Sequence, residues 1–205
     1  MEKKRVSQRE VYRLTIDQIK HLLEAAQEYN LKVLITGAVT TGLRRGELLG
    51  LCWQDIDSQT QTLHVRRIVS SFGIRASTET ARTIALPTMT MHALQEYQTA
   101  QLELGKPAHD FHPVFSNEKG LPLNPNALQQ QYHPLFVAIG QPQMRFHDLR
   151  HSTAAFFLEM GVNIAVIQAI LGFRHRSATN TLAPVTLAMQ QEAMQKWDEI
   201  FGESR

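Results

Sequence analysis

Two arginines and a histidine in this sequence could together hold a phosphodiester and move a proton beside it. Arg44 lies in the segment TGLRRGEL, and Arg150 lies in HDLRH, three residues after His147. Guanidinium groups keep their charge at any cellular pH and bind phosphate oxygens through paired, charge-assisted hydrogen bonds. On one helix, His147 and Arg150 would share a face, where the imidazole could transfer a proton near neutral pH. These residue types therefore predict a site that stabilises charge on a phosphodiester in transfer.

Each of these residues also has a simpler interpretation. Arg44 and Glu47 stand three residues apart in a predicted helix, which is the spacing of an ordinary surface ion pair. Arg45 is interpreted as a solvated neighbour, and Glu47 as a structural brace rather than a DNA contact. His147 alone would be a structural histidine, and His151 is interpreted as a hydrogen-bonded, supporting one.

The elements that must position these residues are predicted to be mostly helical. Thr15 and Gln18 form a capping box, and apolar residues follow at helical spacing. Pro125 marks a helix start, and Gly161 and Gly172 mark helix ends. Further helices are predicted over residues 32–41, 44–50, 89–104, 126–139, 148–160, 164–171 and 186–200.

Alternating apolar residues between 62 and 86, punctuated by Gly73, predict strands. The expected fold class is therefore mostly α with a small antiparallel β-sheet (α+β). Residues 1–14 carry five Lys and Arg against two Glu and are expected to form a basic linker. Residues 15–205 are expected to form one domain.

The composition excludes several classes of protein. The net charge is only +2, so any nucleic-acid binding must come from local basic patches. The single cysteine, Cys52, excludes a disulfide framework within one chain and is expected to be buried. No apolar run approaches the length of a membrane span, so we expect no membrane association and a cytoplasmic protein. We expect no cofactor.

Three segments resemble, in order and separation, the catalytic domain of tyrosine recombinases, the phage integrase family: TGLRRGELLGLCWQDID, ARTIALP, and HDLRH followed by ILGF. The resemblance covers nearly the whole chain and implies the fold of these DNA breaking and rejoining enzymes. It also implies that Arg44 and Arg150 contact the scissile phosphate, with His147 as the acid–base helper. The family has a preceding helical core-binding domain, which we expect to be absent here.

The sequence departs from the family at three functional positions. The family places a lysine in the β-hairpin, but no lysine occurs between Lys32 and Lys106, and Arg75 is a poor proton donor. Phe173 stands where the family has His or Trp, and Leu182 stands at the position of the nucleophilic tyrosine. All four tyrosines of the chain precede the HDLRH motif. Because the covalent pathway needs its nucleophile, we predict a DNA-binding domain of a recombination or integration protein that cannot cleave DNA by itself.

The basic residues predict the DNA-facing surface. Phosphate contacts by lysine and arginine give affinity for double-stranded DNA that is tolerant of sequence and falls with salt. The resemblance puts three groups of basic residues near DNA: one within residues 3–13, one on the hairpin, and one from Arg145 to Arg176. The expected DNA contacts are Arg66, Arg67, Arg75, Arg82, Arg145, Arg174 and Arg176.

Three alternatives remain. The chain could be an active subunit that receives its nucleophile from a different partner. It could be a protein-interaction module, or form a homo-oligomer on DNA through its last helix, although that helix is more simply read as closing its own core. The apolar residues of this helix are Leu187, Met194, Trp197, Ile200 and Phe201.

The third alternative is a zinc hydrolase. His147 and His151 stand four residues apart, as in the zinc motif H-E-x-x-H, with Asp148 in place of the catalytic glutamate. A further ligand would have to come from His175 or Glu159.

Overall fold

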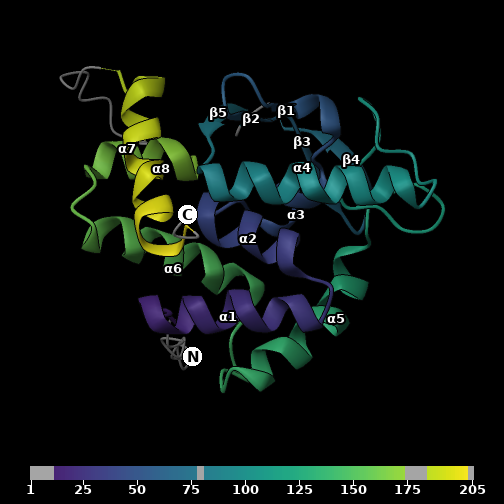
Figure 1. Ribbon diagram of the computed structural model, residues 1–205, viewed down its shortest axis with the longest axis horizontal. Helices are drawn as coiled ribbons and strands as arrows, with labels where there is room; N and C mark the ends of the chain where they lie inside the picture. The colour runs from purple at the N-terminus through teal and green to yellow at the C-terminus, as the bar shows by residue number, and fades with distance from the viewer. Residues whose placement is uncertain (1–11, 78–80, 174–183, 203–205) are drawn as a thin grey trace, which may run out of the picture.

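The computed structural model describes residues 12–77, 81–173 and 184–202 of the chain. Most of these residues are helical, and Figure 1 shows α2 between α4 on one side and α6 on the other. The helices are α1 (Ile16–Glu28), α2 (Lys32–Thr41), α3 (Arg45–Leu49), α4 (Thr88–Glu103), α5 (Pro125–Ala138), α6 (Phe146–Glu159), α7 (Ile164–Leu171) and α8 (Leu187–Phe201), with a short 3-10 turn at Trp53–Asp55.

The strands form two small antiparallel sheets in the described residues, where the sequence predicted one. The first has the order β1 (Ile56–Asp57), β2 (Thr62–Val65) and β5 (Arg82–Ala85), with Leu63 opposite Ile84. The second is a hairpin of β3 (Arg67–Ser70) and β4 (Gly73–Ala76). The hairpin separates because β3 leaves the first sheet at Arg66 and packs on α3 instead.

Gly46 in α3 and Gly50 directly after it let the hairpin approach this closely. A Cβ atom at Gly46 would lie 2.5 Å from the carbonyl oxygen of Val69, and one at Gly50 would lie 2.7 Å from that of Arg67. Both separations are far below van der Waals contact, so larger residues would push β3 away from the helix. The hairpin is therefore fixed to the helix that follows Arg44.

The helix ends follow the signals in the sequence. The Thr15 hydroxyl accepts a hydrogen bond from the backbone N–H of Gln18, and the Gln18 side-chain oxygen accepts one from the backbone N–H of Thr15, which confirms the capping box. Asn124 caps α5, with Pro125 as its first residue. Gly172 ends α7 in a left-handed conformation, with φ +69°. That turn sends the chain from α7 toward Phe173.

The last helix closes the core of its own chain. Trp197 is fully buried and stacks on Phe156 with ring centroids 3.9 Å apart, and Phe201 lies 5.1 Å from the Trp197 ring. The Asp198 carboxylate accepts hydrogen bonds from the backbone N–H groups of Thr88 and Met89 at the start of α4. The prediction that α8 serves its own core is thereby confirmed.

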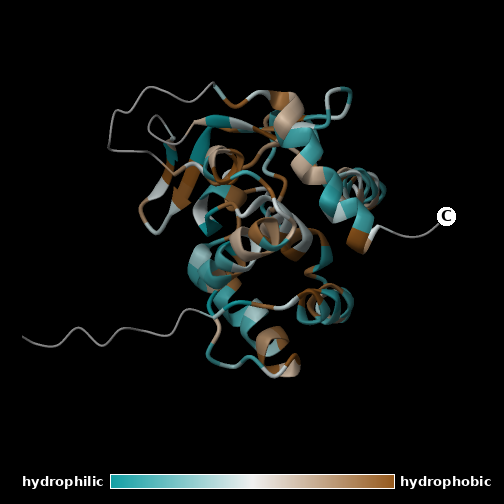
Figure 2. Cartoon of the chain, turned by 90° about the vertical axis from the view of Figure 1, so that its left-hand side faces the viewer, coloured by the Kyte–Doolittle hydropathy of each residue, from teal (hydrophilic) through white to brown (hydrophobic). Residues whose placement is uncertain are grey.

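Figure 2 shows apolar residues concentrated where the elements face one another. Cys52 is buried and free, as predicted. In the described residues, no helix combines the length and the apolar character that crossing a membrane requires.

Candidate functional site

Arg44 begins the site at the amino end of α3. Its Nη1 atom donates a hydrogen bond to Glu47 Oε1 at 2.8 Å, and its backbone N–H donates to Glu47 Oε2 at 3.0 Å. The pairing of Arg44 with Glu47 is therefore present, but the carboxylate is completely buried and is not part of a surface ion pair. The Arg44 side chain remains 38% exposed, so the same guanidinium also faces solvent.

Glu47 joins Arg44 to a second arginine on a distant strand. The Arg82 guanidinium on β5 donates to both carboxylate oxygens, each at 3.2 Å. Burial alone would raise the pKa of Glu47, but the hydrogen bonds and positive charges of Arg82 and Arg44 outweigh it and lower that pKa below 4.5. Glu47 is thus an ionised, buried brace, as the sequence suggested.

Arg150 is held from α6 by two backbone carbonyls. Its Nη1 donates to Gly42 O at 2.8 Å, and its Nη2 donates to Leu171 O at 2.5 Å. Burial, with the nearby charges of Arg44 and Arg82, lowers the pKa of Arg150 to about 10. The group still carries its charge at neutral pH, near the charges of Arg44 and Arg82.

The same guanidinium lies over the ring of Phe173. The Arg150 Cζ atom lies 4.6 Å from the centroid of the Phe173 ring, within the range of a cation–π contact. The ring is 52% exposed. Phe173 therefore keeps an aromatic ring against the arginine, but the ring offers no hydrogen-bond donor.

His147 lies on α6 with Arg150, because the helix begins at Phe146, two residues before the predicted start. Its side chain is exposed, and its ring packs edge-on against His151 at 5.0 Å. Partial desolvation, the His151 ring and the Arg150 and Arg44 charges lower the pKa of His147 below 6.5. The imidazole is therefore neutral at pH 7 and able to accept a proton.

Two histidines alone do not make a metal centre. Across the residues that the structure describes, no group of three or more His, Cys, Asp and Glu could hold a metal ion. Glu159 ends α6, whereas His175 lies outside the described residues.

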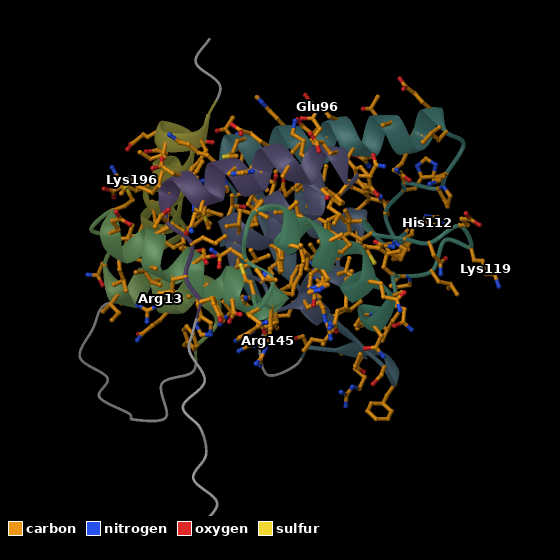
Figure 3. All side chains as sticks on the ribbon, turned by 90° about the horizontal axis from the view of Figure 1, so that it is seen from below. Arg13, Glu96, His112, Lys119, Arg145 and Lys196 are labelled. Carbon is orange, nitrogen blue, oxygen red and sulfur yellow. The ribbon has the colours of Figure 1, made fainter. Side chains whose placement is uncertain are left out.

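The arginines expected to contact DNA fall into three sets. Arg66, Arg75 and Arg145 are exposed, and in Figure 3 Arg145 lies at the lower edge of the molecule, where the β3–β4 hairpin projects. Arg67 is tied to the buried Asp55 carboxylate and to Gly50 O at 3.2 Å, and Arg82 is tied to Glu47. The remaining positions, Arg174, Arg176 and Leu182, lie outside the described residues.

Arg67 and Arg82 thus differ from the expectation of hairpin arginines that face DNA. Each guanidinium is held by a fully buried carboxylate, because an unpaired Asp55 or Glu47 would be costly in the core. Sequence reasoning missed these two links because each joins residues more than ten positions apart, at a spacing that no local pattern marks.

Comparisons with known proteins identify the family and the fold of this chain. The model of the phage integrase family matches residues 12–186. The chain is 27% identical over 215 residues to a tyrosine recombinase XerC-like protein of Caldanaerobacter subterraneus, covering 94% of this chain and 55% of that protein. It is also 27% identical over 188 residues to the integrase of Salmonella phage P22, covering 90% of this chain and 46% of the integrase.

Solved structures share the fold. The Tn1549 transposon integrase, in complex with transposon right end DNA, superposes with a TM-score of 0.71 at 20% identity, over 93% of this chain and 67% of the other. The XerA recombinase superposes with a TM-score of 0.66 at 24% identity, over 95% of this chain and 66% of the other. The chain spans about half the length of the curated relatives it matches.

Proposed function

The chain belongs to the phage integrase family, and from this premise we propose that it binds double-stranded DNA through Arg44 and Arg150 without cleaving it by itself. The relatives it matches are named as recombinases and integrases, which supports a role in site-specific DNA recombination or integration. The Tn1549 integrase was solved on DNA, which supports the choice of ligand.

One observation carries this proposal: Arg44 keeps a guanidinium that is 38% exposed in a cluster of arginine charges. Arg44 and Arg82 both bond to Glu47, and the burial of Arg150, with its repulsion by the Arg44 and Arg82 charges, lowers the pKa of Arg150 to about 10. A phosphate beside the exposed part of Arg44 would relieve that repulsion. The cluster is therefore suited to an anionic group of the DNA backbone.

The exposed arginines extend the proposed surface beyond the cluster. Arg66, Arg75 and Arg145 have solvent-facing side chains and would contact phosphates further along the duplex. Arg67 and Arg82 are bound to buried carboxylates, so we assign them to the framework instead.

The missing nucleophile is the reason for proposing that this chain does not cleave. Leu182 and Phe173 stand where the family has Tyr and His or Trp, and neither side chain can attack phosphorus or donate a proton. Two of the tyrosines that are present have packing roles. Tyr132 is buried beside Phe136 and Phe146, and Tyr97 lies between Trp53 and Phe115.

The test of DNA binding is fluorescence anisotropy on a mixed-sequence duplex across a salt series. We expect the affinity to fall steeply with salt, and Arg44→Ala to weaken binding because it removes the exposed phosphate contact. Lys196→Ala is the control, since Lys196 lies on α8, away from Arg145 in Figure 3. No binding even at low salt would contradict the proposal and favour a protein-interaction role.

The test of cleavage uses a nicked duplex that would trap a covalent intermediate. We expect no adduct to survive denaturation when this chain is the only protein present. An adduct formed by the chain alone would contradict the proposal. An adduct that formed only with a second, tyrosine-bearing recombinase would identify a partner that supplies the nucleophile.

A further inference from the structure

We propose that Arg82 does not contact DNA but positions the two arginines that do, acting through Glu47 and the last turn of α7. This inference rests on the proposed DNA binding. It assigns Arg82 a positioning role, whereas its place on the hairpin in the sequence suggested a phosphate contact.

The first support is the burial of Arg82 among its partners. Its side chain is only 10% exposed, against 38% for Arg44. Two of its nitrogens face the two oxygens of Glu47, each at 3.2 Å, in a paired arrangement that fixes the carboxylate plane. The same carboxylate receives Arg44 Nη1 at 2.8 Å. The orientation of Arg44 therefore depends on a carboxylate that Arg82 holds in place.

The second support is the carboxyl end of α7. Arg82 Nε donates to Ile170 O at 2.8 Å, and Arg150 Nη2 donates to the adjacent carbonyl, Leu171 O, at 2.5 Å. Carbonyls in the last turn of a helix lack partners within the helix and attract cations. One helix end thus sets the positions of two guanidiniums, one from β5 and one from α6.

The third support is the close fit of Gly172 against Arg82. A Cβ atom at Gly172 would lie 2.8 Å from Arg82 Nη1 and 2.9 Å from Arg82 Cζ. The residue after α7 must therefore be a glycine for the guanidinium as well as for its own φ of +69°. Arg82 connects α3, β5 and α7, and its loss would release Glu47 and the end of α7 together.

The first experiment is Arg82→Lys, which keeps the charge but cannot pair with both Glu47 oxygens and Ile170 O at once. We expect the DNA affinity to fall about fivefold, with an unchanged slope of log affinity against log salt, because the number of phosphates contacted stays the same. Lys196→Arg is the control, a Lys–Arg exchange on α8 outside the proposed DNA contacts, and it should keep the affinity within about twofold. In an Arg44→Ala background, Arg82→Lys should lower the affinity less than it does in the parent, because the part of its effect that passes through Arg44 is already lost.

Two results in this series would overturn the inference. If Arg82→Ala lowered the salt slope by about 0.9, Arg82 would be a direct phosphate contact. If Arg82→Lys bound DNA as tightly as the parent, the pairing with Glu47 would have no bearing on the site.

A second pair of substitutions tests the inference without changing Arg82. Gly172→Ala forces a side chain against the guanidinium, whereas Gly161→Ala has nearly the same backbone strain, with φ +72°, and no atom within 4 Å of its Cβ. We expect Gly172→Ala to reproduce the affinity loss of Arg82→Lys, and Gly161→Ala to leave the affinity unchanged. Equal effects of the two substitutions would count against the inference.

A DNA-free measurement separates this inference from the proposed function. The measurement is urea unfolding of four proteins: the parent, Arg82→Lys, Glu47→Gln and the double variant. We expect the double variant to unfold at nearly the same midpoint urea concentration as Glu47→Gln alone. Additive shifts would overturn the inference even if DNA binding is found. If the parent binds no DNA while the shifts are non-additive, the proposed function fails and the positioning of Glu47 by Arg82 stands.

Discussion

Phe173 lies against the guanidinium of Arg150, with the Arg150 Cζ atom 4.6 Å from the centroid of the ring. The two contacts to Gly42 O and Leu171 O use N–H groups in the plane of the guanidinium, and the central carbon of the group lies over the Phe173 ring. The backbone N–H of Phe173 donates to Gln168 O at 3.0 Å, which fixes the residue just after Gly172. Phe173 therefore supports the arginine without being able to hydrogen-bond a phosphate.

This contact predicts that two substitutions of Phe173 differ in their effect on the free energy of unfolding. Phe173→Leu removes the π face and should lower the free energy of unfolding by roughly 0.5–1 kcal/mol, whereas Phe173→Trp should retain it, because Trp is the best cation–π partner. Urea unfolding at pH 7 measures both. Equal stability of the Leu, Phe and Trp proteins would show that the contact contributes nothing.

Removing Arg150 should destabilise the fold as well as the site. Arg150→Met would leave Gly42 O and Leu171 O without their donors in a buried region, at a cost of about 3 kcal/mol. Arg145→Met is the matched control on the same helix. Its side chain is exposed and the capping contact to Asp148 uses the backbone N–H, so the change should stay within about 0.5 kcal/mol. Equal losses in the two variants would contradict the role assigned to Arg150.

Glu47 should make stability depend on pH in the acid range. Arg82 and Arg44 lower its folded-state pKa below 4.5 despite burial, so the stabilisation is present above about pH 4.5 and is lost as the pH falls through the folded-state pKa. Glu47→Gln should be less stable than the parent at pH 7 by about 2 kcal/mol. The difference in the free energy of unfolding between the two proteins should become smaller as the pH approaches 3. Urea unfolding at pH 3, 4, 5 and 7 tests this, and parallel curves for the two proteins would refute it.

Local signals in the sequence predicted most of the helices. The Thr15 capping box, Pro125 and Gly172 each act within one turn, so their structural effect could be read from neighbouring residues. The helix over residues 164–171 was predicted with its observed bounds. The resemblance to the family could also be recognised from the sequence, because TGLR and HDLRH keep their order and separation.

The contacts that join distant segments could not be predicted in this way. Arg82 and Glu47 are 35 positions apart, and nothing in ARTIALP distinguishes an arginine that faces DNA from one that neutralises a buried carboxylate. The division of the strands into two sheets also depends on tertiary packing, since Gly46 of α3 and Gly50 after it leave room for β3 to pack against that helix. Both the Arg82–Glu47 pairing and the separation of β3 depend on which residues are buried. A single sequence indicates burial only through local patterns.

His147 should make DNA binding stronger in mild acid. Desolvation and the positive charges of Arg150 and Arg44 keep its pKa below 6.5, so the imidazole is neutral at pH 7 and adds no charge to the site. A bound phosphate would favour the protonated form, and by linkage protonation would favour the bound phosphate. The affinity for duplex DNA should therefore rise as the pH falls from 7.5 to 5.5.

The measurement is fluorescence anisotropy at constant ionic strength across that range, with His147→Gln and His21→Gln in parallel. His147→Gln should lose part of the rise, on the order of twofold to tenfold at pH 5.5. His21→Gln changes an exposed histidine on α1 and should keep the full rise. If His147→Gln follows the parent at every pH, the imidazole does not face the bound phosphate, and the increase comes from the other histidines of the chain.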